Sequence, residues 1–199
     1  MSAAAALQYI SIEDYLEEEE QASQKHEYYQ GEIFAMAGAS HKHNKLVRDC
    51  LLSIGNHLDN KPCEILPSDI KVHIEANTLT TYPDLSIYCD PIDYYKNRTD
   101  TVTNPTIIIE VLSPSNKDYD RGTKFLLYRD LPSLKEYILI SSTEMLVEKY
   151  TRQTGNEWQL KDYRKPEDEF MIQAIQFTMN VGTLYRNITF DEPIKAPRS

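Results

Sequence analysis

Two carboxylates stand at unusual places in the sequence, and together they could bind a divalent cation. Glu110 interrupts the apolar run Thr106–Leu112, and a charged carboxylate in a buried strand is costly unless it is paired or coordinates a metal. Asp84 follows Pro83 and opens the segment Leu85–Tyr88, and the fixed φ of proline would hold its direction. Carboxylates at neighbouring strand ends suit Mg²⁺ or Mn²⁺, which take oxygen ligands. The sequence therefore predicts a metal site at Asp84 and Glu110.

Chemistry on a phosphate also needs a positive side chain that stabilises developing charge. Lys124 is the candidate, because Asp120, Lys124 and Tyr128 follow one another at four-residue spacing and share one face of a predicted helix. If that face turns toward the end of the Glu110 strand, Lys124 reaches the site. Lys117 precedes this helix and is the weaker choice.

Simpler interpretations exist for the same residues. Glu110 could form a buried ion pair with a lysine or arginine, Asp84 could be a turn residue, and Lys124 could be an ordinary solvated helix lysine. His41 and His43 are too closely spaced to share a helical face. They are interpreted as a polar helix start, with His41 as the one that could face a cleft.

At this point the sequence resembles a known group of proteins. The segments TYPDLSIYCD, IIIEVLSPS and DRGTKFLLYRDLPSLKEYILI resemble the PD-(D/E)XK nuclease superfamily and, more narrowly, its Uma family of restriction-endonuclease-like proteins. The segments KHEYYQGEIFAMAGAS and LPSDIKV are also similar to that family. The resemblance covers residues 10 to 188, so it includes nearly the whole chain.

The resemblance implies roles for individual residues. It places Asp84 at the motif aspartate and Glu110 at the motif glutamate, while Leu112 stands where the superfamily has its lysine. In this family the lysine is expected to have moved to the following helix, at Lys124. Glu32 and Asp69 lie in other segments that resemble the family, and they are predicted to complete the site or to brace it.

The implied function is a metal-dependent endonuclease that hydrolyses DNA phosphodiester bonds with a Mg²⁺-activated water. A homodimer fits this function, since many members of the superfamily pair to cut two strands. Two alternatives stay open: a catalytically inactive nuclease-fold protein that binds or regulates, and a metal-dependent phosphoesterase for small substrates. The position of Leu112 and the net charge of −10 favour the inactive alternative.

The predicted fold is α/β (α+β), with a restriction-endonuclease-like mixed central sheet flanked by helices and extra β-hairpins. The whole chain, 1–199, is predicted to be one domain with a core over residues 10–190 and a short loose tail, Ala196–Ser199. Apolar periodicity predicts helices at Ser11–Gln24, His41–Leu58 and Asp118–Arg129, and Ser40 can cap the second of them. The predicted strands are 63–66, 70–74, 85–88, 107–112 and 136–141, with hairpins in 26–37 and 145–163 and a connection at 77–81. From 166 onward the sequence predicts an irregular strand-and-turn segment with a short helical turn near Leu184.

Composition narrows the class of protein further. The chain has no apolar stretch of about 18 residues, which a membrane helix requires, and its acidic N-terminal region does not resemble a signal peptide. Three cysteines without metal spacing, Cys50, Cys63 and Cys89, are predicted to be reduced thiols in a cytoplasmic protein.

Overall fold

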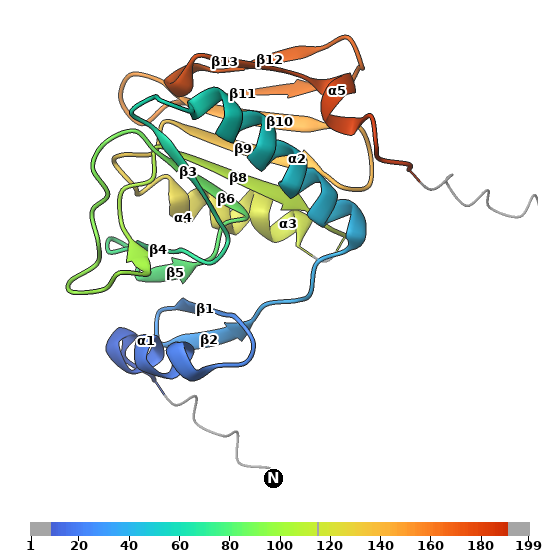
Figure 1. Cartoon of the computed structure of the whole chain (residues 1–199). Coiled ribbons are helices and arrows are strands. Elements are labelled where there is room, and N and C mark those ends of the chain that lie inside the picture. Colours follow the sequence, from blue (N-terminus) through green and yellow to red (C-terminus); the bar gives the residue numbers. More distant parts are fainter. Residues whose placement is uncertain (1–8, 115, 191–199) are drawn as a thin grey trace, which may run out of the picture.

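Six strands form the central sheet, in the order β11-β10-β9-β8-β6-β3 (Figure 1). The protein is described by a computed structural model over residues 9–114 and 116–190. The strands of this sheet are β3 (Glu64–Pro67), β6 (Leu85–Tyr88), β8 (Ile107–Leu112), β9 (Glu136–Ser141), β10 (Val147–Arg152) and β11 (Trp158–Tyr163). The pair β8 and β9 is parallel, and the other neighbours are antiparallel. Both parallel strands are buried along their whole length, which explains their continuous apolar sequence.

Side chains of β8 alternate between two faces of the sheet, and each face has its own core. The face that carries Ile109 packs against α2 (His41–Leu58). The face that carries Ile108 packs against α4 (Phe125–Tyr128) and against a second sheet, which has five strands. Because side chains alternate along a strand, Glu110 belongs to the second face. Its carboxylate therefore points toward the helix that connects β8 with β9.

A second sheet of five strands contributes to the core on this side, in the order β2-β1-β5-β4-β7. Its strands are β1 (His26–Tyr29), β2 (Glu32–Ala35), β4 (Lys71–Ile74), β5 (Leu79–Thr81) and β7 (Thr101–Val102). The predicted hairpin is confirmed, and Gln30 and Gly31 turn the chain at φ 49° and 91°. Such positive φ angles at both turn residues are typical of a type I′ turn.

The prediction that residues 77–81 only connect two strands is wrong. Leu79–Thr81 form β5, which lies between β1 and β4, and Thr80 pairs with both Tyr28 and His73. All three residues of β5 are buried. A strand this short has too few residues to display an alternating pattern, so its pairing partners define it.

Serine caps begin the two helices predicted in the first third of the chain. In α1 (Ile12–Gln21) Ser11 accepts from the backbone N–H of Asp14, and in α2 Ser40 accepts from the N–H of His43. Such caps satisfy N–H groups that lack a partner within the helix. Helix α2 has the predicted bounds, and none of the helices in residues 9–114 and 116–190 is long and apolar enough to cross a lipid bilayer.

The C-terminal part is more regular than the predicted strand-and-turn segment. A hairpin of β12 (Glu169–Ile172) and β13 (Phe177–Asn180) leads into the short helix α5 (Val181–Tyr185). This helix contains the turn predicted near Leu184, and its buried side chains pack in the core beside α2. The predicted loose tail, Ala196–Ser199, lies outside the described residues.

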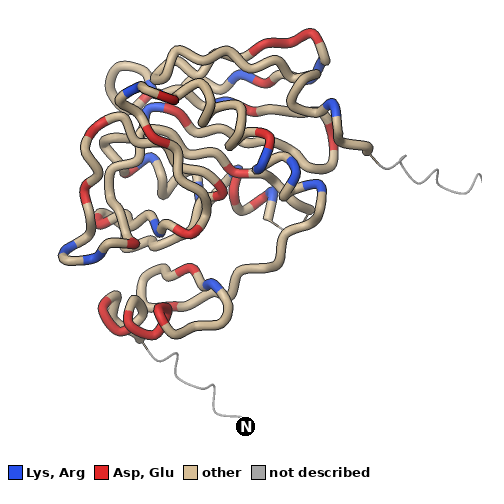
Figure 2. The backbone as a smooth tube through the Cα atoms, viewed as in Figure 1, with Lys and Arg blue, Asp and Glu red and all other residues tan. Residues whose placement is uncertain are grey.

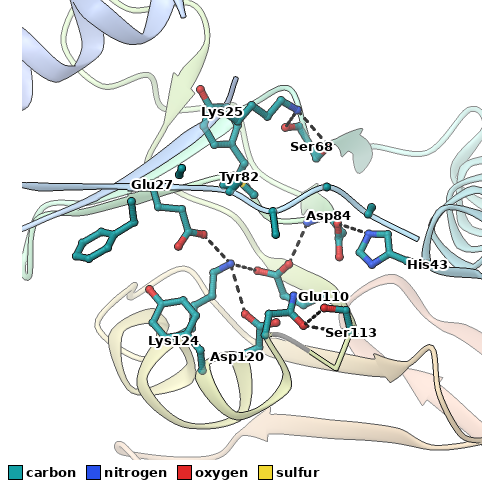
Figure 3. Close-up of a pocket in the computed structure, with 18 of the residues that line it drawn as sticks. Lys25, Glu27, His43, Ser68, Tyr82, Asp84, Glu110, Ser113, Asp120 and Lys124 are labelled. Atoms are coloured by element: carbon teal, nitrogen blue, oxygen red, sulfur yellow. Dashed lines mark hydrogen bonds and ion pairs between the residues drawn. The ribbon is translucent and has the colours of Figure 1, made fainter. Parts of the chain in front are cut away.

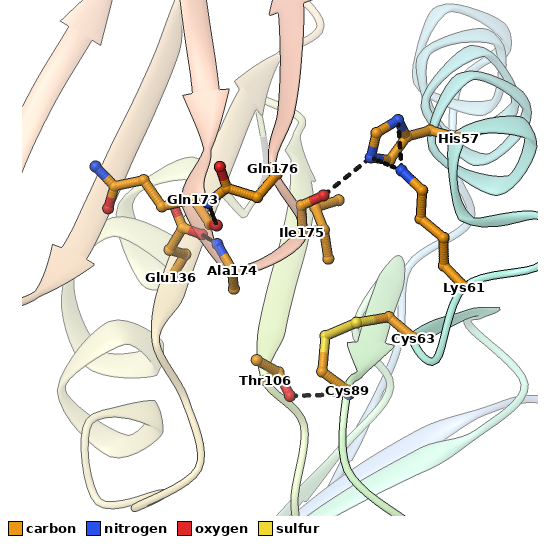
Figure 4. The surroundings of a disulfide bond; sticks show 10 residues. All are labelled: His57, Lys61, Cys63, Cys89, Thr106, Glu136, Gln173, Ala174, Ile175 and Gln176. Carbon is orange, nitrogen blue, oxygen red and sulfur yellow. Dashed lines mark hydrogen bonds between the residues drawn. A yellow bond between two sulfur atoms is a disulfide. The ribbon is translucent and has the colours of Figure 1, made fainter.

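The cysteine prediction requires a correction, because Cys63 and Cys89 form a disulfide bond (Figure 4). The antiparallel register of β3 and β6 pairs Glu64 with Tyr88, so the next residues outward face each other. Their Cα atoms lie 4.0 Å apart. The two cysteines are 26 residues apart in the sequence, so no local pattern predicts this pairing. The third cysteine, Cys50, is a free, buried thiol.

Candidate active site

Strand register brings the two predicted metal ligands together. β6 pairs Leu85 with Ile109 of β8, so one step further along the antiparallel pair Asp84 lies opposite Glu110. The Glu110 carboxylate accepts the backbone N–H of Asp84 at 3.1 Å, and the Asp84 carboxylate accepts the N–H of Val111 at 2.7 Å. Each carboxylate is thus held by the strand that carries the other.

Lys124 lies at the centre of the site (Figure 3). Its ammonium is 2.9 Å from Glu110, 3.0 Å from Glu27 and 3.6 Å from Asp120, and its side chain is buried. The lysine therefore reaches Glu110 from the following helix, as the sequence interpretation requires. Lys117, the weaker candidate, is exposed and is not among the residues that line the cavity.

The helix that carries Lys124 is not a regular α-helix. Between α3 (Lys117–Tyr119) and α4, residues Asp120–Lys124 form a π-helical turn. Such turns are rare and are often found at functional sites. Beyond the turn, the Tyr128 hydroxyl donates to Glu110 at 3.1 Å. All three residues predicted to share a face therefore contact this cluster.

Glu27 comes from the second sheet and was not singled out from the sequence. It lies on β1, where the hydroxyl of Thr81 donates to it and Lys124 forms an ion pair with it. The signal was weak, since HEYY is a short segment in which a glutamate could equally face solvent. Its burial is decided by the packing of the two sheets around Lys124.

His43 is the second residue that the sequence interpretation missed. Its Nε2 lies 3.0 Å from Asp84 Oδ1, and its side chain is only 9% exposed. A usable signal existed, because His43 precedes Leu46 and Cys50 at helical spacing on the buried face of α2. The residue predicted to face a cleft, His41, is exposed instead.

These side chains line an open cavity of about 650 Å³. The walls come from both sheets, the start of α2, the segment Met36–Ala39 and the π-helical turn. Among the residues that line it are Lys25, Ser68, Tyr82, Ser113 and Asn116. The charged cluster therefore forms the floor of a cleft that is open to solvent.

Negative charge exceeds positive charge in this cluster. Burial raises the pKa of Glu110 to about 8, although the Lys124 ammonium opposes the shift. Burial also raises the pKa of Asp120 to about 6. Burial lowers the pKa of Lys124, but Glu110 and other neighbouring groups outweigh it and leave it well above its ordinary value. One lysine therefore stays charged beside more carboxylates than it can neutralise.

The cluster has the chemistry to accept a cation. Among the described residues, neither buried carboxylate oxygen of Asp120 has a hydrogen-bond partner, although Lys124 lies 3.6 Å away. Buried acceptors are normally satisfied by protein, water or an ion. Asp84 and Glu110 supply the oxygen atoms that Mg²⁺ and Mn²⁺ prefer. Within residues 9–114 and 116–190, no three His, Cys, Asp or Glu side chains are already arranged around a common metal position. A cation would thus have to draw these side chains together.

For His43, the balance of effects favours the charged form. Burial lowers its pKa, but the hydrogen bond to Asp84 and the charges of Asp84 and Glu110 raise it overall. The imidazole is therefore protonated more readily than an ordinary histidine, because its charged form is stabilised by the half-buried carboxylate of Asp84.

The structure does not bring the two supporting candidates into the cluster. Glu32 is exposed on β2, and the side chain of Asp69 is 84% exposed. Neither lines the cavity. Asp69 instead forms an ion pair at 2.6 Å with Lys25, which does line it. Asp69 is therefore placed to orient Lys25 rather than to touch a metal.

Comparison with known proteins identifies the family of this chain. The family model of Uma2, described as "Putative restriction endonuclease", matches residues 12–182. The chain belongs to the Uma2 family. The match spans every element from α1 to the start of α5, which confirms the predicted resemblance. Uma2 proteins are grouped as restriction-endonuclease-like, so the chain is nuclease-like in family.

Two relatives from Synechocystis sp. match almost the whole chain. The uncharacterized protein slr1290 is 38% identical over 181 residues, which is 91% of this chain and 94% of that protein. The uncharacterized protein sll1609 is 35% identical over 177 residues, which is 88% of this chain and 100% of that protein. The Uma2 chain and these relatives thus share nearly their full lengths.

A solved structure has the same fold. It is described as a "putative nuclease belonging to DUF820" from Anabaena variabilis, and it superposes with a TM-score of 0.72 at 16% identity. The similarity covers 89% of this chain and 98% of that one. The predicted fold class, a mixed sheet flanked by helices, is confirmed by this likeness.

Proposed function

We propose that this protein is a metal-dependent endonuclease that hydrolyses phosphodiester bonds of DNA. The observation that carries the proposal is the pair of half-buried Asp84 and buried Glu110, with Lys124 2.9 Å from Glu110, on the floor of an open cavity. The family and the fold support a nuclease-like activity. The metal, the substrate and the roles of the residues are inferred from this geometry.

Asp84 and Glu110 would hold Mg²⁺ or Mn²⁺ through their carboxylate oxygens. When bound, such a cation lowers the pKa of water and neutralises charge on a phosphate. Asp84 is the more accessible ligand, with a side chain 18% exposed, whereas Glu110 is held from behind by Tyr128. Asp84 would therefore bind the cation on the side nearer to solvent, and Glu110 would be the ligand whose position is fixed.

Lys124 would stabilise the negative charge that develops on the phosphate during cleavage. Its carboxylate partners keep it protonated and fix its direction, because Glu27 and Asp120 contact the same ammonium as Glu110. This arrangement places the positive group beside Glu110 even though Leu112 stands at the usual lysine position. The position of Lys124 thus weakens the argument that Leu112 makes the protein inactive.

DNA is proposed as the substrate because α2, which supplies part of the cavity wall, also carries basic side chains. Figure 2 shows basic positions along the N-terminal half of α2, while α1 is acidic. These positions on α2 are Lys42, Lys45 and Arg48, and the same helix supplies Asn44 and Val47 to the wall of the cavity. Lysine and arginine beside a cleft suit contacts with a phosphate backbone. Cutting both strands needs two sites, so we expect a homodimer.

Cleavage of supercoiled plasmid DNA tests the proposal. Wild-type protein with Mg²⁺ or Mn²⁺ is expected to nick the plasmid, and EDTA is expected to stop it. Asp84→Asn should lower the rate at least about 100-fold, because removing one group that acts on the transition state costs that much. Asp162→Asn changes the same functional group on β11, where the side chain is exposed and outside the cavity, and should cut like wild type.

Equal cutting by the wild-type and Asp84→Asn proteins would reject the assigned site. Metal-dependent hydrolysis of nucleotides without cutting of the polymer would instead favour a phosphoesterase for small substrates. Absence of any metal-dependent hydrolysis, in protein shown to be folded, would favour a binding or regulatory protein.

A further inference from the structure

Beside Asp84, the imidazole nitrogen of His43 lies in the lining of the same cavity. Resting on the proposed function above, we infer that His43 is a third ligand of the cation, through Nε2, and that it makes the site prefer Mn²⁺ over Mg²⁺. None of the motif residues that carry the family resemblance predicts this role. It rests on the geometry of His43, Asp84 and the cavity.

The distance between the two donor atoms suits shared coordination. His43 Nε2 and Asp84 Oδ1 lie 3.0 Å apart. Neighbouring ligands of an octahedral ion with metal–ligand bonds of about 2.1 Å are separated by about 3.0 Å. A cation could therefore contact both atoms after the proton between them has left, while Glu110 would have to be drawn in to complete a set of three ligands. Glu110, which accepts the backbone N–H of Asp84, lies beside this position.

The position of His43 in the fold makes it available for this role. The residue lies in the first turn of α2, whose start is fixed by the Ser40 cap, and its ring lines the cavity beside Asp84 (Figure 3). Its Nδ1 has no hydrogen-bond partner among the described residues. The ring is thus held mainly by packing and by Asp84.

The donor set then decides which cation is favoured. Mg²⁺ is a hard cation that binds oxygen ligands and keeps several waters. Imidazole nitrogen suits Zn, Cu, Fe and Ni best, and Mn²⁺ prefers carboxylate oxygen as Mg²⁺ does. As a transition-metal ion, however, Mn²⁺ accepts an imidazole ligand more readily than Mg²⁺. A site built from Asp84, Glu110 and His43 therefore binds Mn²⁺ more tightly than the same site without the imidazole.

Pulsed electron paramagnetic resonance of bound Mn²⁺ tests the ligand directly. The full-length protein is loaded with Mn²⁺, and the spin-echo modulation from nearby nitrogen nuclei is recorded. We expect modulation from a ¹⁴N nucleus of an imidazole. Protein grown with ¹⁵N-histidine should show the corresponding ¹⁵N signal. This comparison uses only the wild-type sequence, so it does not depend on the folding of a variant.

Calorimetry supplies the second measurement. His43→Gln should lose the nitrogen signal and bind Mn²⁺ roughly tenfold or more weakly, as loss of a group around a metal generally does, while the affinity for Mg²⁺ changes less. His41→Gln alters an exposed histidine on the same turn and should keep both the signal and the affinities of the wild type.

The outcomes separate this inference from the proposed function. If Mn²⁺ binds and Asp84→Asn abolishes binding, but no histidine nitrogen couples to the ion, His43 is not a ligand and the metal site itself stands. If the folded wild-type protein binds no Mn²⁺, the proposed metal site fails and this inference fails with it. An unchanged ratio of Mn²⁺ to Mg²⁺ affinity in His43→Gln would also overturn the claimed preference.

Discussion

The ammonium of Lys124 is the residue-scale feature on which the site depends. It contacts Glu27, Glu110 and Asp120 in a buried setting. A buried ion pair adds little stability relative to an apolar pair, but removal of one partner leaves an uncompensated charge. The cluster is therefore intolerant of neutral replacements, and its stability and its proposed chemistry depend on the same atom.

Lys124→Met is expected to lower the free energy of unfolding by about 3 kcal/mol, because it leaves buried carboxylates without their cation. Urea unfolding at neutral pH measures this change. Lys117→Met removes an exposed lysine of the same segment and should alter stability by no more than about 0.5 kcal/mol. If both variants have the same free energy of unfolding as the wild type, the buried ion pairs do not contribute to stability as described.

At the scale of elements, two local features position the site. The antiparallel register of β6 and β8 sets Asp84 beside Glu110, and the π-helical turn at Asp120–Lys124 places the lysine against the same carboxylate. At the opposite end of β6, the disulfide between Cys63 and Cys89 ties this strand to β3 at the edge of the sheet. Hydrogen bonds to β8 thus hold β6 at the end next to Asp84, and the disulfide bond holds it at the other end.

Reduction of the disulfide is expected to destabilise the protein by about 3 kcal/mol, since it frees a loop of this length in the unfolded chain. Urea unfolding with and without dithiothreitol measures the effect. The variant with both Cys63→Ser and Cys89→Ser should be insensitive to the reductant. Thiol counting in denaturant provides a check: Cys50 alone should react before reduction, and a count of three before reduction would contradict the bond.

The charge of the whole molecule shapes how it would meet DNA. The net charge is −10, and a protein of this sign is repelled by DNA except where basic residues are concentrated. The N-terminal half of α2 has such residues next to the cavity. Binding is therefore expected to be weak, local and sensitive to salt.

This expectation is tested with the Asp84→Asn protein, which should bind DNA without cutting it. Fluorescence anisotropy with a labelled duplex at several salt concentrations should give an affinity that falls as salt rises. The slope of log affinity against log salt concentration reports the number of phosphate contacts. Adding Lys42→Ala and Lys45→Ala should reduce the magnitude of this slope by about two, one for each phosphate contact. Lys161→Ala, an exposed change on β11 at the far edge of the sheet, should leave the slope unchanged. An unaltered slope in the α2 variant would remove this surface from the proposal.

Local sequence determined most of the elements and part of the site. The continuous apolar runs at Ile107–Leu112 and Glu136–Ser141 predict the central strands because both faces of a parallel pair are buried. The serine cap and apolar spacing predict α2 with its observed bounds. Glu110 could be singled out because a carboxylate in such a run needs a partner. Each of these signals depends on neighbours within a few residues along the chain.

Tertiary structure alone decided the rest, because the remaining contacts join segments far apart in sequence. Glu27 on β1 of the second sheet reaches Lys124 in the π-helical turn, and His43 on α2 reaches Asp84 at the start of β6. The pairing of Cys63 with Cys89 depends on the register of two strands, which no local pattern specifies. Burial, pairing and charge compensation are set by packing between such segments, so the sequence pointed to the carboxylates and the fold supplied their partners.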